Sequence, residues 1–103
     1  MSTIKFDQDI RRFVVNGELS FNTVPELFKL GQQLMEKDNE LVFDFKATSC
    51  RDSSGLALLT DLMRAAKMQR KSICFIHVPH QLLAVAAACN LDSILPIVRS
   101  NDG

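Results

Sequence analysis

The chain has few of the residues that build phosphate-binding loops or disulfide frameworks. It contains only four glycines, and neither a Walker-type loop nor a Gly-x-Gly-x-x-Gly motif occurs. Its three cysteines, Cys50, Cys74 and Cys89, are odd in number and widely spaced, so no disulfide framework is implied. We therefore expect no loop that binds the phosphates of a nucleotide. We also expect the protein to reside in a reducing compartment, the cytoplasm.

The chain also lacks net charge and any long apolar run. Twelve basic residues balance twelve acidic ones, and no basic stripe indicates a nucleic-acid partner. Residues 1–9 alternate charged and apolar side chains, unlike the apolar segment of a secretory leader. No stretch approaches the roughly 18 apolar residues of a membrane span. We expect no nucleic-acid partner and no direct insertion into a membrane.

Residues suited to catalysis are sparse. His77 and His80 straddle Pro79 with no cysteine or carboxylate nearby in sequence, which is too few ligands for a metal site. Cys50 or Ser53 would need a histidine base, itself oriented by a third group, to act as a nucleophile. The sequence therefore favours a protein without enzymatic activity, metal or other cofactor. A small hydrolase built on Cys50 or Ser53 is the enzyme alternative.

Hydrophobic patterning predicts a single α/β domain over residues 1–103 with the order ββαβαβα. Strands are expected over 4–6, 10–15, 41–45 (with Asp44 exposed) and 72–77, and helices over 23–37, 54–70 and 80–89; residues 94–98 leave room for a final strand. Thr23 and Glu26 have the spacing of a capping box, and Asn16-Gly17 is expected to end the second strand. Since strands alternate with helices in the second half, neighbouring strands there should be parallel.

The most informative segment is Asp52-Ser53-Ser54-Gly55, which follows a strand and a polar loop and opens a helix. A helix N-terminus is partly positive and rich in N–H donors. As the N-cap, Ser53 would contribute on the order of 1 kcal/mol to the helix. As a phosphorylation site it would gain nearly two negative charges, which the helix dipole favours and Asp52 opposes. Both roles of Ser53 stay open.

The helix over residues 54–70 carries more apolar residues than one sheet contact needs. One stripe suffices to pack on a sheet: Leu56, Leu59, Met63 and Ala66. A second stripe lies beside it: Leu58, Leu62, Ala65 and Met68. We expect the second stripe to form an exposed apolar edge beside Ser53, which would bind a partner. A core that is simply wide at this point is the alternative, and self-association through the edge is left open.

Two motifs in this ββαβαβ context resemble the STAS domain family: Gly17-Glu18-Leu19 after the second strand, and Asp52-Ser53-Ser54-Gly55-Leu56 at the start of a helix. The resemblance covers nearly the whole chain. It implies a small mixed sheet with helices packed mainly on one face. It also implies a protein that binds partners rather than one that catalyses a reaction.

Two branches of the family compete. Gly55-Leu56-Ala57-Leu58-Leu59 and the tail over 91–97 resemble MlaB, a subunit of bacterial phospholipid transporters. That branch implies a cytoplasmic subunit, peripheral to the inner membrane, that docks on the ATPase of an ABC-type transporter and supports outer-membrane lipid asymmetry. The docking residues would include Ser53, Ser54, Leu58 and Leu62. The Asp-Ser-Ser-Gly motif instead resembles anti-sigma factor antagonists, in which a partner kinase would phosphorylate Ser53.

Overall fold

Strands and helices alternate along the chain in the order that the sequence predicts. The computed structural model describes residues 1–99. Its elements are β1 (Thr3–Asp7), β2 (Arg12–Leu19), α1 (Val24–Leu34), the short 3-10 helix η1 (Met35–Lys37), β3 (Glu40–Cys50), α2 (Ser54–Met68), β4 (Ser72–Ile76) and α3 (His80–Ala88). The order ββαβαβα is confirmed. In place of a final strand, the described part of residues 94–98 makes one isolated bridge, between Ile97 and Phe75.

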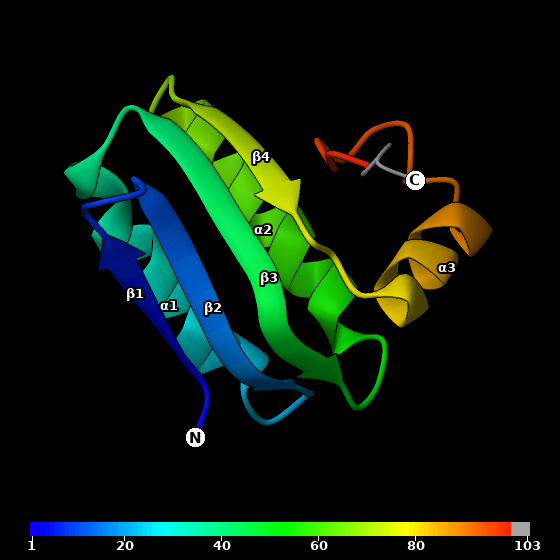
Figure 1. Cartoon of the computed structure of the whole chain (residues 1–103). Coiled ribbons are helices and arrows are strands. Elements are labelled where there is room, and N and C mark those ends of the chain that lie inside the picture. Colours follow the sequence, from blue (N-terminus) through cyan, green and yellow to red (C-terminus); the bar gives the residue numbers. More distant parts are fainter. Residues whose placement is uncertain (100–103) are drawn as a thin grey trace.

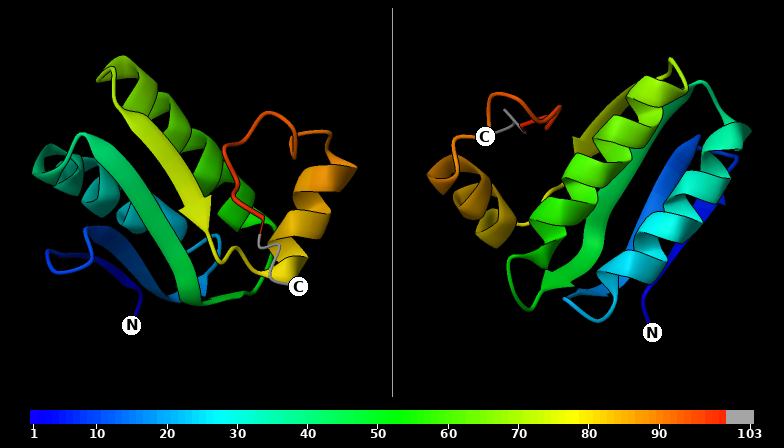
Figure 2. Two further views of the ribbon diagram at one scale, coloured as in Figure 1. Left: turned by 45° about the horizontal axis from the view of Figure 1, so that its top comes forward. Right: turned by 180° about the vertical axis from the view of Figure 1, so that it is seen from behind.

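A mixed four-stranded sheet forms the centre of the molecule, in the order β1-β2-β3-β4. β1 and β2 are antiparallel, whereas β3 runs parallel to both β2 and β4. The crossovers contain α1 and α2, which cover the same face of the sheet, while α3 lies beyond the β4 edge (Figure 1, Figure 2). The expected mixed sheet with helices mainly on one face is confirmed, and its opposite face is left free of α1 and α2.

A row of phenylalanines crosses the covered face of the sheet. Each strand contributes one member in matching register: Phe6, Phe13, Phe43 and Phe75. Successive ring centroids lie 4.7, 4.9 and 6.3 Å apart, and the rings of Phe13, Phe43 and Phe75 are fully buried. An aromatic pair contributes about 0.5–1.5 kcal/mol beyond its buried area. The row therefore fixes the register of the sheet as well as its core.

Two expected strand boundaries are wrong, and both for the same reason. β2 continues through Asn16 and Gly17 to Leu19, and β3 continues past Phe45 to Cys50, because these polar ends pair with each other. A shift in register between Val14 and Asn16, together with a φ of 109° at Gly17, lets the pairing resume. Backbone hydrogen bonding, which side-chain patterning does not reveal, extends both strands.

The second stripe of α2 is not an exposed edge. Leu58 and Leu62 are 0% exposed and Ala65 is 6% exposed, so the expectation that these side chains form an exposed edge for docking is wrong. The physical reason is that α2 contacts α1 and α3 as well as the sheet. Leu62 packs closely on Gly31 of α1, where an added β-carbon would lie 3.0 Å from a Leu62 methyl carbon. The wide-core alternative is the correct one for these three residues, and Met68 alone of the second stripe is exposed.

Leu62→Ala should lower the free energy of unfolding by about 2–5 kcal/mol, because it leaves a cavity between α1 and α2. The matched control is Met68→Ala in the same helix, which should change stability by less than about 0.5 kcal/mol because Met68 is 86% exposed. Urea denaturation followed by circular dichroism measures both. Equal stability of the two variants would contradict this packing.

Candidate functional site

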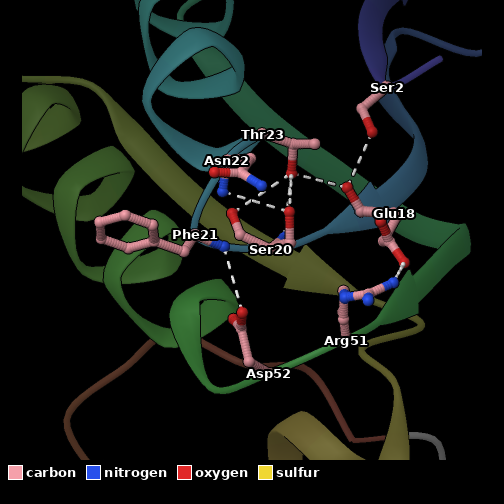
Figure 3. A network of polar contacts seen from close by, with 8 residues as sticks. All are labelled: Ser2, Glu18, Ser20, Phe21, Asn22, Thr23, Arg51 and Asp52. Atoms are coloured by element: carbon pink, nitrogen blue, oxygen red, sulfur yellow. Dashed lines mark hydrogen bonds and ion pairs between the residues drawn. The ribbon is translucent and has the colours of Figure 1, made fainter.

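The loops that follow β2 and β3 lie side by side at the carboxyl ends of these parallel strands (Figure 1, Figure 3). Leu19 pairs with Cys50 at the last position of both strands, and the Arg51 N–H donates to the Leu19 carbonyl at 3.0 Å. The next residues of each strand therefore leave the sheet together. In α/β folds this edge is where ligands and partners commonly bind.

The carboxylate of Asp52 joins the two loops. Its Oδ2 accepts the Phe21 N–H at 3.2 Å (Figure 3). Its Oδ1 accepts the Ser54 N–H at 2.8 Å. A hydrogen bond from the Ser54 side chain, followed by the backbone bonds from Ser54 and Phe21, lowers the pKa of Asp52 below its usual value. Each donor favours the charged form of the carboxyl group. Asp52 thus accepts the first backbone N–H of α2 and also positions the neighbouring β2–α1 loop.

Ser53 occupies the N-cap position of α2 but does not cap it. Its side chain is exposed, and its hydroxyl makes no hydrogen bond within residues 1–99. An N-cap serine ordinarily accepts a backbone N–H from the first turn, yet here Asp52 accepts the N–H of Ser54. The capping role considered for Ser53 is therefore wrong, and its hydroxyl is free at the positive end of a helix.

Gly55 lets the first turn of α2 approach its neighbours closely. A β-carbon at this position would lie 3.1 Å from a Leu82 methyl carbon of α3 and 3.2 Å from a Leu19 methyl carbon of β2. Beside this contact, the segment from Cys50 to Ser53 and three residues of α3 line a small open cavity of about 250 Å³; the helical residues are Gln81, Leu82 and Val85. Exposed Ser53 thus borders a concave surface.

The β2–α1 loop is closed by a hydrogen-bond network rather than by the expected capping box. Thr23 Oγ1 accepts the Ser20 N–H at 2.9 Å and donates to the Glu18 carbonyl at 2.7 Å, and it makes no capping bond to α1 (Figure 3). Arg51 pairs with the Glu18 carboxylate at 3.4 Å across the two loops. These contacts present a defined loop beside Ser53.

Residues 2–102 match the family model of the STAS domain. The chain belongs to the STAS domain family. No curated protein matches it by sequence. The Asp52–Gly55 segment and the Gly17–Leu19 segment, which suggested the family, both border the site described above.

Two solved structures with a similar fold are of anti-sigma factor antagonists. The first is SpoIIAA in its unphosphorylated form, with 16% identity, a TM-score of 0.69, and coverage of 96% of this chain and 89% of that one. The second is a putative antagonist from Thermotoga maritima, with 16% identity, a TM-score of 0.68, and coverage of 95% and 86%. At this identity the likeness shows the fold alone.

Sequence reasoning missed Phe21 in this STAS domain. Phe21 is 79% exposed at the tip of the β2–α1 loop, and its backbone N–H is held by Asp52. Exposed aromatic side chains are typical anchors of protein interfaces. The signal was present, because Phe21 stands alone in the polar stretch Ser20-Phe21-Asn22-Thr23 between two apolar segments.

The geometry does not favour a nucleophilic enzyme. The cavity beside Ser53 and Cys50 is lined by no histidine, and His77 instead bonds Asp44 at 2.9 Å. Burial, followed by the charge of Asp52, raises the pKa of the Cys50 thiol, which leaves less reactive thiolate.

Within residues 1–99, no three His, Cys, Asp or Glu side chains lie close enough together to hold a metal ion. None of the helices in this range has the length and apolar character that a membrane span requires.

The role of Asp52 predicts a specific acid titration. The pKa of Asp52 is lowered in the folded state. At pH values above the usual pKa of an aspartate, the charged carboxylate therefore binds both loops, and this contribution to stability is lost as the pH falls through the lowered pKa. The amide NMR signals of Phe21 and Ser54 should shift together with a midpoint below the usual range of an aspartate. In Asp52→Asn the shared titration should vanish. A midpoint at or above the usual range would contradict the assignment.

Proposed function

We propose that this STAS domain is a non-catalytic binding module of the anti-sigma factor antagonist type, whose contact with a protein kinase is switched by phosphorylation of Ser53. The observation that carries the proposal is the exposed Ser53 hydroxyl, which makes no hydrogen bond within residues 1–99. The descriptions of the two structural relatives, SpoIIAA as an anti-sigma factor antagonist and the Thermotoga maritima protein as a putative one, support it. The partner kinase would itself be the anti-sigma factor.

The electrostatics of the site suit a switch. The Ser53 oxygen would attack the γ-phosphorus of ATP, the bond to ADP would break, and the hydroxyl proton would be released. The product carries nearly two negative charges next to the Asp52 carboxylate and at the N-terminus of α2. A partner that docks on this edge would meet a more negative surface, since the phosphoryl charge adds to the one negative charge that Asp52 already provides.

The accessory subunit of an ABC transporter is the less supported function. It was inferred from the residues of α2 and of the tail, and two of its expected docking residues, Leu58 and Leu62, are fully buried. Docking on a transporter ATPase would then have to use the exposed residues at the start of α2. The same surface would serve either partner, so the identity of the partner decides between them.

Ser53→Asp should weaken binding to the partner kinase at least tenfold, whereas Ser53→Ala should bind as tightly as the unmodified protein. Isothermal titration calorimetry measures both. Incubation with kinase and ATP should add one phosphoryl group by intact mass, and Ser53→Ala should abolish this. The matched control is Ser54→Ala, which should still be modified.

Modification of a residue other than Ser53, or unchanged binding of Ser53→Asp, would contradict the switch. Purification of the tagged protein from detergent-solubilised membranes provides the second arm of the test. Recovery of an ATP-binding subunit together with an integral permease, and of no kinase, would replace the antagonist function with the transporter one.

Phe21→Ala should weaken partner binding at least tenfold, because exposed aromatic side chains anchor interfaces. The urea midpoint should not change, because Phe21 is 79% exposed and is not among the residues that pack on the hydrophobic core. Ile10→Ala is the control, since Ile10 is also exposed but lies in the β1–β2 turn at the other end of the strands. Equal affinity of the two variants would remove Phe21 from the interface.

A further inference from the structure

A groove on the free face of the sheet is separate from the Ser53 site. Its volume is about 1070 Å³, against about 250 Å³ for the cavity beside Ser53. Arg12, Lys46 and Ile76 line it, and each is the strand neighbour of a buried phenylalanine. Because successive strand residues point to opposite faces, these side chains lie on the face that α1 and α2 leave free. The size is close to the upper end of the usual range of ligand sites.

One wall of the groove is aliphatic. Leu83, Ala84 and Ala87 of α3 line the groove together with Ile97 and Val98. The core side of α3 is formed by other residues, Leu82 and Ala86, which are its only buried ones. A helix exposed on one side normally has charged residues there, yet α3 reads His-Gln-Leu-Leu-Ala-Val-Ala-Ala-Ala. Leu83 and Ile97 are half-buried against the core. Ala84, Ala87 and Val98 are exposed, so this part of the apolar wall is not explained by packing against the core.

The floor of the groove is basic and is organised around one buried carboxylate. The expectation that Asp44 is exposed is wrong, since it is only 8% exposed. Asp44 contacts His77 Nδ1 at 2.9 Å and the Arg12 guanidinium at 3.6 Å, and accepts the Lys46 N–H at 2.9 Å. His77 has a φ of 55°, a backbone conformation uncommon outside glycine that this bond helps to hold.

The charges that remain available in the groove are positive. Within residues 1–99, the Lys46 ammonium makes no ion pair, and Arg12 has Asp44 as its only acidic partner. The acidic residue in the lining, Asp92, is paired with Arg99 at 3.6 Å. The guanidinium of Arg12 has donors beyond the one facing Asp44. A negatively charged group could thus be held beside Arg12, Lys46 and His77.

We propose that the groove binds a single-chain amphiphile with an anionic headgroup. The headgroup, a carboxylate or a phosphate monoester, contacts Arg12, Lys46 and His77, and the alkyl chain lies along Leu83, Ala84 and Val98. A nucleotide fits less well, because the lining contains no Phe, Tyr or Trp on which a base could stack. This site goes beyond the proposed switch and does not use Ser53.

Calorimetric titration at neutral pH and low salt tests the ligand class. Dodecanoate and dodecyl phosphate, each below its micelle concentration, should bind with one molecule per chain, and the tighter of the two identifies the headgroup. Dodecyl maltoside, which has the tail without the charge, and acetate, which has the charge without the tail, should bind at least tenfold more weakly. Amide and methyl NMR shifts should locate the ligand at Leu83, Ala84 and Val98.

Matched variants test the location. Ala84→Trp should weaken binding at least tenfold by filling the groove, whereas Ala88→Trp, exposed on the same helix but outside the lining, should bind normally. Lys46→Gln should weaken binding several-fold, and Lys29→Gln, on the helix across the sheet, should not. Far-ultraviolet circular dichroism and urea midpoints establish that all four variants fold.

Three results would overturn the proposal. The first is absence of binding by both anionic amphiphiles. The second is equal affinity for dodecyl maltoside, which would mean nonspecific detergent adsorption. The third is normal binding by folded Ala84→Trp, or NMR shifts centred on the cavity beside Ser53, which would place the ligand elsewhere.

Discussion

The row of phenylalanines from β1 to β4 is the constraint on which the rest of the structure depends. A shift of one residue in strand pairing moves a whole strand's apolar side chains to the opposite face. The stacked pair of Phe13 and Phe43, with centroids 4.9 Å apart, excludes such a shift between β2 and β3. The same register brings Leu19 opposite Cys50 at the strand ends. The core thereby decides which loop residues meet at the edge of the sheet.

The meeting of the two loops explains why the Ser53 hydroxyl does not cap α2. With both strands ending together, Asp52 lies close enough to accept N–H groups from Phe21 and from Ser54 at once. An ionised carboxylate is a stronger acceptor than a hydroxyl; here it accepts the first N–H of α2, and the Ser53 hydroxyl makes no capping bond to the helix. Within residues 1–99, the Ser53 hydroxyl is thus left without a hydrogen bond. Packing of four rings in the core is connected in this way to the exposed hydroxyl of Ser53 at the surface.

Sequence reasoning found the helices and strands, but it did not show which other helices and strands each of them would contact. The order of strands and helices followed from apolar spacing, and α2 was correctly started at Ser54. The ends of β2 and β3 were missed because their pairing uses backbone groups. Burial of Leu58, Leu62 and Ala65 was missed because a helical pattern shows how apolar a face is, while α1 and α3 decide what covers it.

The surplus of apolar surface that the sequence suggested for α2 lies on α3 instead. Of the nine residues of α3, Leu82 and Ala86 are buried in the core. Leu82 and Val85 also line the small cavity beside Ser53, and Leu83, Ala84 and Ala87 form the wall of the larger groove. A helix that is apolar all round is usually buried all round. Since α3 is not, each of its uncovered sides is apolar surface left available for binding.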